Sequence, residues 1–375
     1  MKISLENQAW LESFWQKLEN KLSKTAVKSR NKIPCAAIDG MHDDCSPERI
    51  IRWTNGFWGG LMWLMYSATQ KECYKLTAEA SGERMLNAFT FADKLDHDVG
   101  FQFHILYGAE YNLTGNRWAR NNNLIASMML SSRYEPLGGF IRAWNPNQNA
   151  TKDGWTIIDT MMNLPLLYWA SKETGDMRYQ RYAIKHADMT MRDHVREDGS
   201  VNHIVVHNPL VEGEIIETRG GQGCDVGSSW SRGCSWAVYG FVLSYIHTGK
   251  KEYLDTAIKC ANYFVEQTKA TDYLPRCDFR QPDTPKHYDS TAGVIASCGL
   301  IELAKILDDE SYLEQAINIL KKLEKDCCDF SLDTDFILGM GMESYAIGIQ
   351  KNIIYGDFYL AEAILKLKGN TFLPW

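Results

Sequence analysis

One apolar helical segment ends and a second begins in the stretch Ala170-Ser171-Lys172-Glu173-Thr174-Gly175, with Tyr179 and Ala183 in the second segment. A glycine directly after a helix supplies the left-handed conformation that ends it, and so short a turn makes the next helix antiparallel. The stretch therefore predicts a helical hairpin. Similar stretches recur at residues 66–70 with Tyr74, 111–115 with Trp118 and Ala119, 245–249 with Tyr253 and Ala257, 303–309 with Tyr312 and Ala316, and 361–369.

Six such hairpins predict a closed ring, because a repeated unit that cannot bury its apolar face alone is stabilised by neighbouring copies. The last copy lacks its second helix. Residues 6–22 carry Trp10, Phe14 and Leu18 on one face, so this N-terminal segment is the predicted partner. Strand signals are weak apart from residues 202–207. The sequence predicts an all-α (α/α)6 barrel of six helical hairpins, forming a single domain over residues 1–375.

Composition argues against several classes of partner. The net charge of −7 is unsuited to binding nucleic acid through its phosphates. No apolar run approaches the roughly 18 residues of a membrane helix, so no membrane segment is expected. The first ten residues lack the apolar core of a secretory signal, which favours a cytoplasmic protein. The glycine-rich stretch 219–223 matches no nucleotide fingerprint, and no cofactor is expected.

The 10 cysteines predict neither a disulfide scaffold nor a metal centre. They are scattered and include no CxxC pair, which is typical of reduced residues in a core. Cys35, His42, Asp43 and Cys45 are residue types that bind metals, but their spacing matches no zinc template. No metal is expected.

Polar loops containing glycine or aromatic residues precede the six predicted inner helices, about one helix length before each turn. Equal helix lengths would place all six loops at one mouth of the barrel. Helix N-termini there present N–H groups suited to an anionic ligand, so the pattern predicts a pocket. The loops are residues 53–58, 96–101, 155–163, 228–233, 287–293 and 354–358.

Two of these loops each contribute a carboxylate, Asp98 and Asp159. Such a pair suits acid/base chemistry, since one carboxyl can be kept neutral while its neighbour stays charged. Asp159 lies in an apolar run, so its pKa is open to tuning by its surroundings. The alternative for Asp159 is a helix N-cap, a common role of aspartate.

Other residues of the loops could bind a sugar. Arg232 would supply a permanent charge for a carboxylate, whereas His203 could contact a ligand or be a structural histidine. Flat aromatic faces pack well on sugar rings, and about half of the tryptophans near the loops are expected to do so, the rest being core. These tryptophans are Trp53, Trp58, Trp144, Trp155, Trp230 and Trp236.

The motifs resemble those of the unsaturated glucuronyl hydrolases, glycoside hydrolase family 88. The resemblance extends from about Ile51 to Asp357, with several motifs in the same order and spacing. The motifs are Trp53-Thr54-Asn55-Gly56-Phe57-Trp58, His97-Asp98-Val99-Gly100-Phe101, Ile157-Ile158-Asp159-Thr160-Met161-Met162-Asn163-Leu164-Pro165-Leu166-Leu167 and Ser229-Trp230-Ser231-Arg232-Gly233.

This resemblance implies an enzyme that removes a Δ4,5-unsaturated uronic acid from the non-reducing end of oligosaccharides made by polysaccharide lyases. In the family the vinyl ether is protonated at C4, water adds at C5, and the resulting hemiketal rearranges and expels the next sugar. Asp159 falls on the acid/base position and Asp98 on the second essential carboxylate. Protonating a carbon needs a neutral carboxylic acid, and the apolar setting of Asp159 with the Asp98 charge nearby would keep Asp159 in that state. The implied substrate contacts are Trp53, Trp144, His203, Gln222, Arg232 and Trp236.

The chain departs from the family pattern at Gly221, where members often have histidine, and at Cys234-Ser235, where they often have Gln-Ala. These changes affect the expected substrate range more than the reaction. Glycosaminoglycan-type fragments are the expected substrates, and the short, largely apolar stretch 339–351 favours unsulfated ones. The alternatives are an unsaturated rhamnogalacturonyl hydrolase acting on pectin fragments, a sugar epimerase and a non-catalytic sugar-binding protein. The oligomeric state is not predicted.

Overall fold

The computed structural model describes residues 3–147 and 151–375, and its inner helices form the predicted closed ring. Each inner helix contacts the next, and the last contacts the first, so the predicted (α/α)6 barrel is confirmed. The predicted domain limits include residues 1–2 and 148–150, which lie outside the described residues. The inner ring consists of α2 (Gly56–Thr69), η3 (Gly100–Gly108) continued by α4 (Ala109–Thr114), α6 (Leu164–Thr174), α8 (Ser231–Thr248), α10 (Ser290–Leu307) and α12 (Ile354–Leu367).

An outer layer of amphipathic helices covers this ring. Outer helix α7, for example, buries only Ala183, His186, Ala187, Met189 and Thr190, whereas every residue of inner helix α12 is buried. A helix covered on all sides must be apolar all round, and a helix covered on one side needs only an apolar stripe. The outer helices are α3 (Glu72–Met85), α5 (Arg117–Ser131), α7 (Met177–Asp193), α9 (Lys251–Lys269), α11 (Glu310–Cys327) and α1 (Leu5–Lys28).

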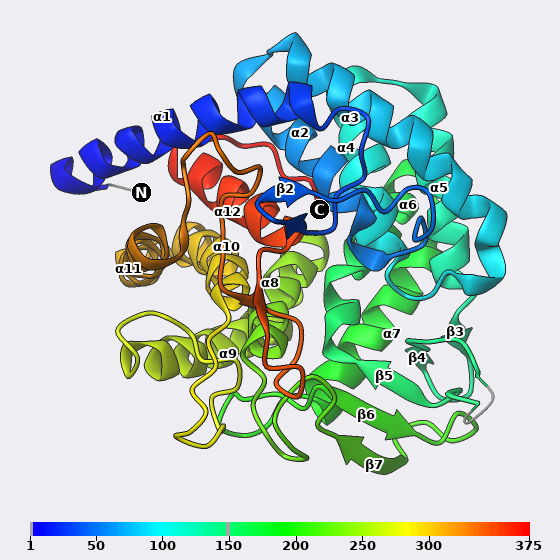
Figure 1. Cartoon of the computed structure of the whole chain (residues 1–375). Helices are drawn as coiled ribbons and strands as arrows, with labels where there is room; N and C mark the ends of the chain where they lie inside the picture. The colour runs from blue at the N-terminus through cyan, green and yellow to red at the C-terminus, as the bar shows by residue number, and fades with distance from the viewer. Residues whose placement is uncertain (1–2, 148–150) are drawn as a thin grey trace.

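Helix α1 completes the outer layer as the sequence predicted. Figure 1 shows this N-terminal helix, in blue, running past α12, in red, and α1 also packs against α3. It buries Leu11, Phe14, Leu18 and Leu22 among other residues. On its other side, Trp10 Nε1 donates to Glu324 of α11 at 2.6 Å. Helix α1 is therefore the outer helix of the sixth hairpin and contacts the outer helices of the first and fifth.

The turns between inner and outer helices use the left-handed conformation at the positions that the repeat predicted. Gly115, Gly175 and Gly249 have φ of 73°, 75° and 69°. Gln70 and Asp308 take the same conformation at 57° and 52° despite their side chains. The left-handed backbone conformation therefore recurs at these turns even where the residue is not glycine.

The second inner helix begins as a π-helix, η3, which the sequence did not predict. Its backbone approaches α2 very closely at Gly56. A Cβ at this position would lie 2.2 Å from the carbonyl oxygen of Phe101 and 2.4 Å from that of Gln102. The glycine is required because any side chain would collide with these backbone atoms.

Short strands lie at the mouth of the barrel, below α7 in Figure 1. The predicted strand is present as β6 (Ile204–His207), between β5 (Trp155–Ile157) and β7 (Ile215–Arg219) in an antiparallel sheet. Three two-stranded pairs complete the strands of the described residues. They are β1 (Ala37–Ile38) with β2 (Met41–His42), β3 (Tyr134–Glu135) with β4 (Phe140–Ile141), and β8 (Gly341–Met342) with β9 (Gln350–Lys351).

Helix α10 corrects the expectation that no segment has the length and apolar character of a membrane helix. Its 18 residues meet that criterion, but 78% of them are buried inside the protein. The helix packs against α8, α11 and α12. Its apolar composition is explained by its position in the inner ring.

Gly175→Ala should lower the stability of the barrel by about 1 kcal/mol, because a left-handed conformation costs an L-residue that amount. A Cβ at Gly175 would meet no atom within 4 Å, so the effect isolates the backbone. Gln70→Gly is the matched control and should raise stability, since it relieves the same conformation. Thermal unfolding midpoints measure both changes, and shifts of the same sign would contradict this account.

Candidate active site

A pocket of about 570 Å³ opens at the N-terminal ends of the inner helices, as the loop positions predicted. Five of the predicted site residues line it, namely Trp53, Asp98, Trp144, Gln222 and Arg232. Asp159 and His203 adjoin it, and Trp236 does not line it. The sequence therefore located the mouth correctly and misplaced one of its tryptophans.

Asp98 precedes η3, and its carboxylate is 13% exposed. Its Oδ1 accepts from Asn163 Nδ2 at 3.3 Å and lies 3.5 Å from His97 Nε2. Burial, with the charges of Asp96 and Asp159, raises the pKa of the Asp98 carboxyl well above its usual range. The Asp98 carboxyl therefore retains its proton more readily than an ordinary aspartate.

Asp159 lies in the short 3-10 helix η4 (Ile158–Met162), and its carboxylate is also 13% exposed. Its Oδ2 lies 3.5 Å from His203 Nε2. The N–H of Gln222 donates to His203 Nδ1 at 3.0 Å, so the proton of a neutral His203 ring is on Nε2 and faces Asp159. The N-cap alternative for Asp159 is wrong, because Ile157 and Asn163 are the cap residues of η4 and α6.

The two carboxyl groups have the opposite protonation preference to the one the sequence predicted. Burial acts to raise the pKa of Asp159, but the hydrogen bond and charge of His203, then the charges of His97 and Arg232, leave that pKa below its usual value. The apolar residues around Asp159 in the sequence point into the core and do not decide its protonation. These pKa directions run opposite to the expectation that Asp159 is the neutral carboxyl, and they favour the proton on Asp98.

Arg232 lines the pocket, where the sequence placed it as a charge for a substrate carboxylate, and its guanidinium also has protein partners. Its guanidinium is 1% exposed and pairs with Asp289 at 2.5 Å. It also donates to the carbonyls of Met342 and Glu343, the latter at 2.8 Å. Because Asp289 balances the charge, Arg232 mainly fixes the segment at Met342 and Glu343 as one wall of the pocket.

The tryptophans divide as expected, half in the core and half nearer the surface. Trp58, Trp230 and Trp236 are at most 1% exposed, whereas Trp53, Trp144 and Trp155 are half-buried. Trp236 packs against Phe101 and Tyr359, with ring centroids 5.3 and 5.6 Å away. The side chain has no exposed surface and does not line the pocket, so its assignment as a substrate contact gains no support from this structure.

The family comparison agrees with this geometry. The model of Glycosyl Hydrolase Family 88 matches residues 25–246. The chain belongs to this family. Unsaturated glucuronyl hydrolase of Bacillus sp. (strain GL1) is 33% identical over 335 residues, which cover 86% of this chain and 88% of that protein. Unsaturated chondroitin disaccharide hydrolase of Streptococcus pneumoniae (strain ATCC BAA-255 / R6) is 31% identical, covering 86% and 83%.

Solved structures of unsaturated glucuronyl hydrolases have the same fold as this chain. The crystal structure of unsaturated glucuronyl hydrolase from Bacillus sp. GL1, a protein responsible for the degradation of glycosaminoglycan, matches with a TM-score of 0.88 and 30% identity. The match covers 94% of this chain and 97% of that one. The unsaturated glucuronyl hydrolase of Streptococcus agalactiae matches with a TM-score of 0.85, 27% identity and coverage of 96% and 93%.

The departures from the family 88 pattern lie around the pocket but do not enter it. Gly221 has φ of 61°, and a Cβ there would lie 2.1 Å from His203 Nδ1. The glycine thus lets the Gln222 N–H reach the histidine. Cys234 and Ser235 are buried in α8, where Ser235 Oγ donates to the Arg232 carbonyl. None of the three lines the pocket.

The sequence did not predict several residues that line this family 88 pocket. Arg52 and Tyr355 lie beside or within the quoted loops, so their positions were a usable signal. Glu343 lies in the stretch 339–351, which the sequence linked to sulfate tolerance without naming this residue, and its segment is held by Arg232. The other lining residues outside the predicted set are Ile51, Thr54, Lys94, Asp96, Ser344, Ile347 and Ile353.

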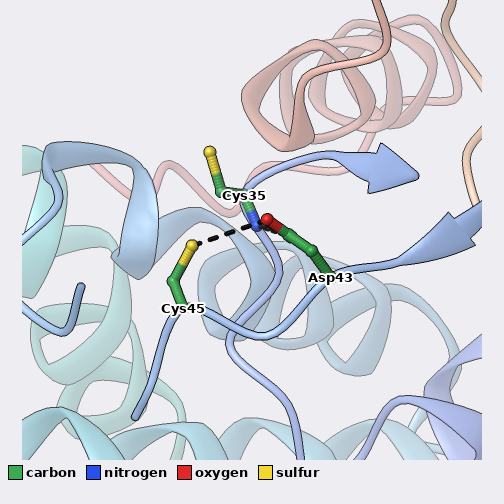
Figure 2. Close-up of side chains that lie close together, drawn as sticks. All are labelled: Cys35, Asp43 and Cys45. Carbon is green, nitrogen blue, oxygen red and sulfur yellow. Dashed lines mark hydrogen bonds between the residues drawn. The ribbon is translucent and has the colours of Figure 1, made fainter. Parts of the chain in front are cut away.

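The N-terminal loop brings together three of the four metal-ligand residue types noted in the sequence. Figure 2 shows Cys35, Asp43 and Cys45 with their side chains close together. His42 instead bonds Ser29 at 3.0 Å. Asp43 already accepts from the N–H groups of Cys35 and Ala36 at 2.7 and 3.0 Å and pairs with Arg49 at 3.1 Å. These contacts show that Asp43 stabilises the conformation of the loop.

Arg232→Ala should destabilise the protein by about 3–5 kcal/mol, because it leaves Asp289 buried without its partner. Arg219→Ala is the control: Arg219 and Glu217 form an exposed pair, and losing it should cost under about 1 kcal/mol. Denaturant unfolding measures both. Equal effects of the two changes would show that Arg232 does not hold the wall of the pocket.

Proposed function

We propose that this protein is an unsaturated glucuronyl hydrolase that removes a Δ4,5-unsaturated glucuronic acid from the non-reducing end of glycosaminoglycan-type oligosaccharides. The observation that carries the proposal is the pair of carboxyl groups at the pocket, Asp98 with a raised pKa and Asp159 with a lowered one. Trp53 and Trp144 beside them offer flat faces for sugar rings. Relatives bearing this activity in their names support the substrate class.

The proposed reaction needs one proton donor and one proton acceptor at the same time. A proton is added to C4 of the unsaturated ring while water loses a proton and its oxygen bonds to C5. The hemiketal formed then opens and releases the next sugar. A carboxyl pair that shares a single proton supplies both groups: Asp98 holds the proton and Asp159 accepts one from water, with His203 beside it.

The reaction should remove the ultraviolet absorbance of the conjugated double bond in unsaturated glycosaminoglycan disaccharides. Asp159→Asn should lower kcat by about 10² or more with little change in KM, because the carboxylate acts in the transition state. Asp98→Asn should have a similar effect. Asp153→Asn is the control and should leave turnover unchanged, because Asp153 lies outside the pocket and its side chain is 43% exposed.

A panel that adds unsaturated pectin disaccharides tests the rhamnogalacturonyl alternative directly. Faster turnover of the pectin fragments would favour that specificity. An isomerised product formed without water uptake would indicate an epimerase, and tight binding without turnover would indicate a sugar-binding protein.

Unsulfated disaccharides should be turned over faster than sulfated ones. Glu343 lines the pocket and pairs with Arg52 and Lys351 at 3.1 and 3.4 Å, so its carboxylate would compete with a sulfate for both cations. A sulfate placed near Glu343 would meet its negative charge. By contrast, a structure of the Streptococcus agalactiae enzyme is complexed with dGlcA-GalNAc6S.

Paired rate measurements on sulfated and unsulfated chondroitin disaccharides test this preference. Glu343→Gln should narrow the difference, because it removes the negative charge and releases Arg52. A faster rate on the sulfated substrate in the unchanged protein would contradict the prediction.

A further inference from the structure

Asn163 occupies the junction between η4 and α6 but does not act as the helix cap expected of an asparagine there. It is the residue before α6, and its side chain makes no capping hydrogen bond. Its Oδ1 instead accepts from the Phe101 N–H of η3 at 2.8 Å. Its Nδ2 donates to Asp98 Oδ1 at 3.3 Å and to the Asp159 carbonyl at 3.4 Å. One amide therefore contacts both carboxylate-bearing residues.

The Asn163 side chain is tightly packed on all sides. The residue is 0% exposed, and its own N–H donates to the Thr160 carbonyl at 2.8 Å. A Cβ at Gly100 would lie 2.5 Å from Asn163 Oδ1 and 2.7 Å from its Cα. The backbone at Gly100, two residues after Asp98, therefore packs directly against the Asn163 amide, and only glycine fits there.

We propose that Asn163 is a positioning residue for the proposed hydrolysis, whose amide orients the Asp98 carboxylate and fixes the Asp159 turn against it. A substrate cannot touch the buried amide, so Asn163 acts through the two aspartates. Its loss should affect the reaction step more than substrate binding. The inference rests on the proposed function, and its test includes a measurement that does not need turnover.

The Asn163 amide also acts on the pKa of Asp98, in the direction opposite to the negative charges around that carboxyl. Burial and the negative charges of Asp96 and Asp159 raise the pKa of Asp98, whereas the hydrogen bond from Asn163 lowers it, as does the cation of Arg133. His97 adjoins the carboxylate, and its own pKa is lowered to about 4 by burial, so it is neutral at pH 7. His203 and Arg232 face the neighbouring Asp159. Removing the amide should therefore raise the pKa of Asp98 further.

Two substitutions test the role. Asn163→Ala removes the amide, and Asn163→Asp keeps its shape and the acceptor for the Phe101 N–H while replacing the donor with a carboxyl group. Both should lower kcat by about tenfold or more, since small misplacements of reacting groups are costly, with KM changed by less than about threefold. Both should move the basic limb of the pH profile to higher pH, because the shared proton is held more tightly.

Two controls separate this role from general damage to the fold. Asn123 is a second fully buried asparagine, bonded to His104 at 3.1 Å and outside the pocket. Asn123→Ala should lower stability but leave kcat and the pH profile unchanged. Asp96→Asn should shift the basic limb to lower pH, because it removes a negative charge near Asp98.

The pH dependence of thermal unfolding supplies a measurement without substrate. At acid pH Asp98 is protonated in both proteins, so Asn163→Ala loses only neutral contacts. At alkaline pH it also loses a hydrogen bond to a carboxylate, so its deficit in unfolding midpoint should widen as pH rises. The deficit of Asn123→Ala should stay constant.

These measurements distinguish the two proposals. An unchanged protein that turns over no unsaturated disaccharide would overturn the proposed function, while a widening deficit would still support the contact between Asn163 and Asp98. An active protein whose Asn163 variants keep the kcat and basic limb of Asn123→Ala would overturn the positioning role. If Asn163→Ala does not fold, the kcat and basic limb of Asn163→Asp are compared with those of Asn123→Ala instead.

Discussion

Burial of the inner helices on all sides is the constraint on which the rest of the structure depends. Every residue of α12 from Ile354 to Leu367 is buried, so its charged groups need partners inside the barrel. Glu362 has them, with Lys366 at 3.5 Å and Trp375 Nε1 at 3.2 Å. Polar chemistry that must meet solvent is consequently restricted to the helix ends, and the pocket lies at the N-terminal ends.

The sequence predicted the features that local chemistry determines. A turn such as 170–175 carries its own conformational signal in Gly175, so the hairpins and their order could be predicted. The π-helix η3 could not, because its close contact with Gly56 joins segments distant in sequence. Such contacts have no short-range pattern, and the same applies to the two strands that flank β6.

The position of the site was predictable for the same reason, but the roles of its residues were not. Placing Asp98, Asp159 and Arg232 at one mouth required only equal helix lengths. The partner of Arg232 is Asp289, 57 residues away, so the sequence did not show that this guanidinium also supports the pocket wall. Trp236 follows Arg232 closely in sequence, yet it lies on the core side of α8 and has no exposed surface.

The protonation of the two aspartates shows why side-chain environment cannot be inferred from neighbours in sequence. Asp159 lies among apolar residues in the chain, but the group nearest its carboxylate is His203, whose ring is oriented by the Gln222 N–H. The residues next to Asp98 in the sequence are more polar, but its carboxyl group faces Asp96 and Asp159, two charges of its own sign.

Two like charges in a poorly hydrated site do not ionise independently, so the proton goes to the carboxyl group with the weaker hydrogen-bond donors. The donor to Asp98 is the neutral Asn163 amide at 3.3 Å, which limits how far its proton affinity rises, whereas Asp159 faces the His203 ring at 3.5 Å. The division between acid and base is therefore a property of the whole mouth of the barrel, set by residues from at least three inner-helix loops.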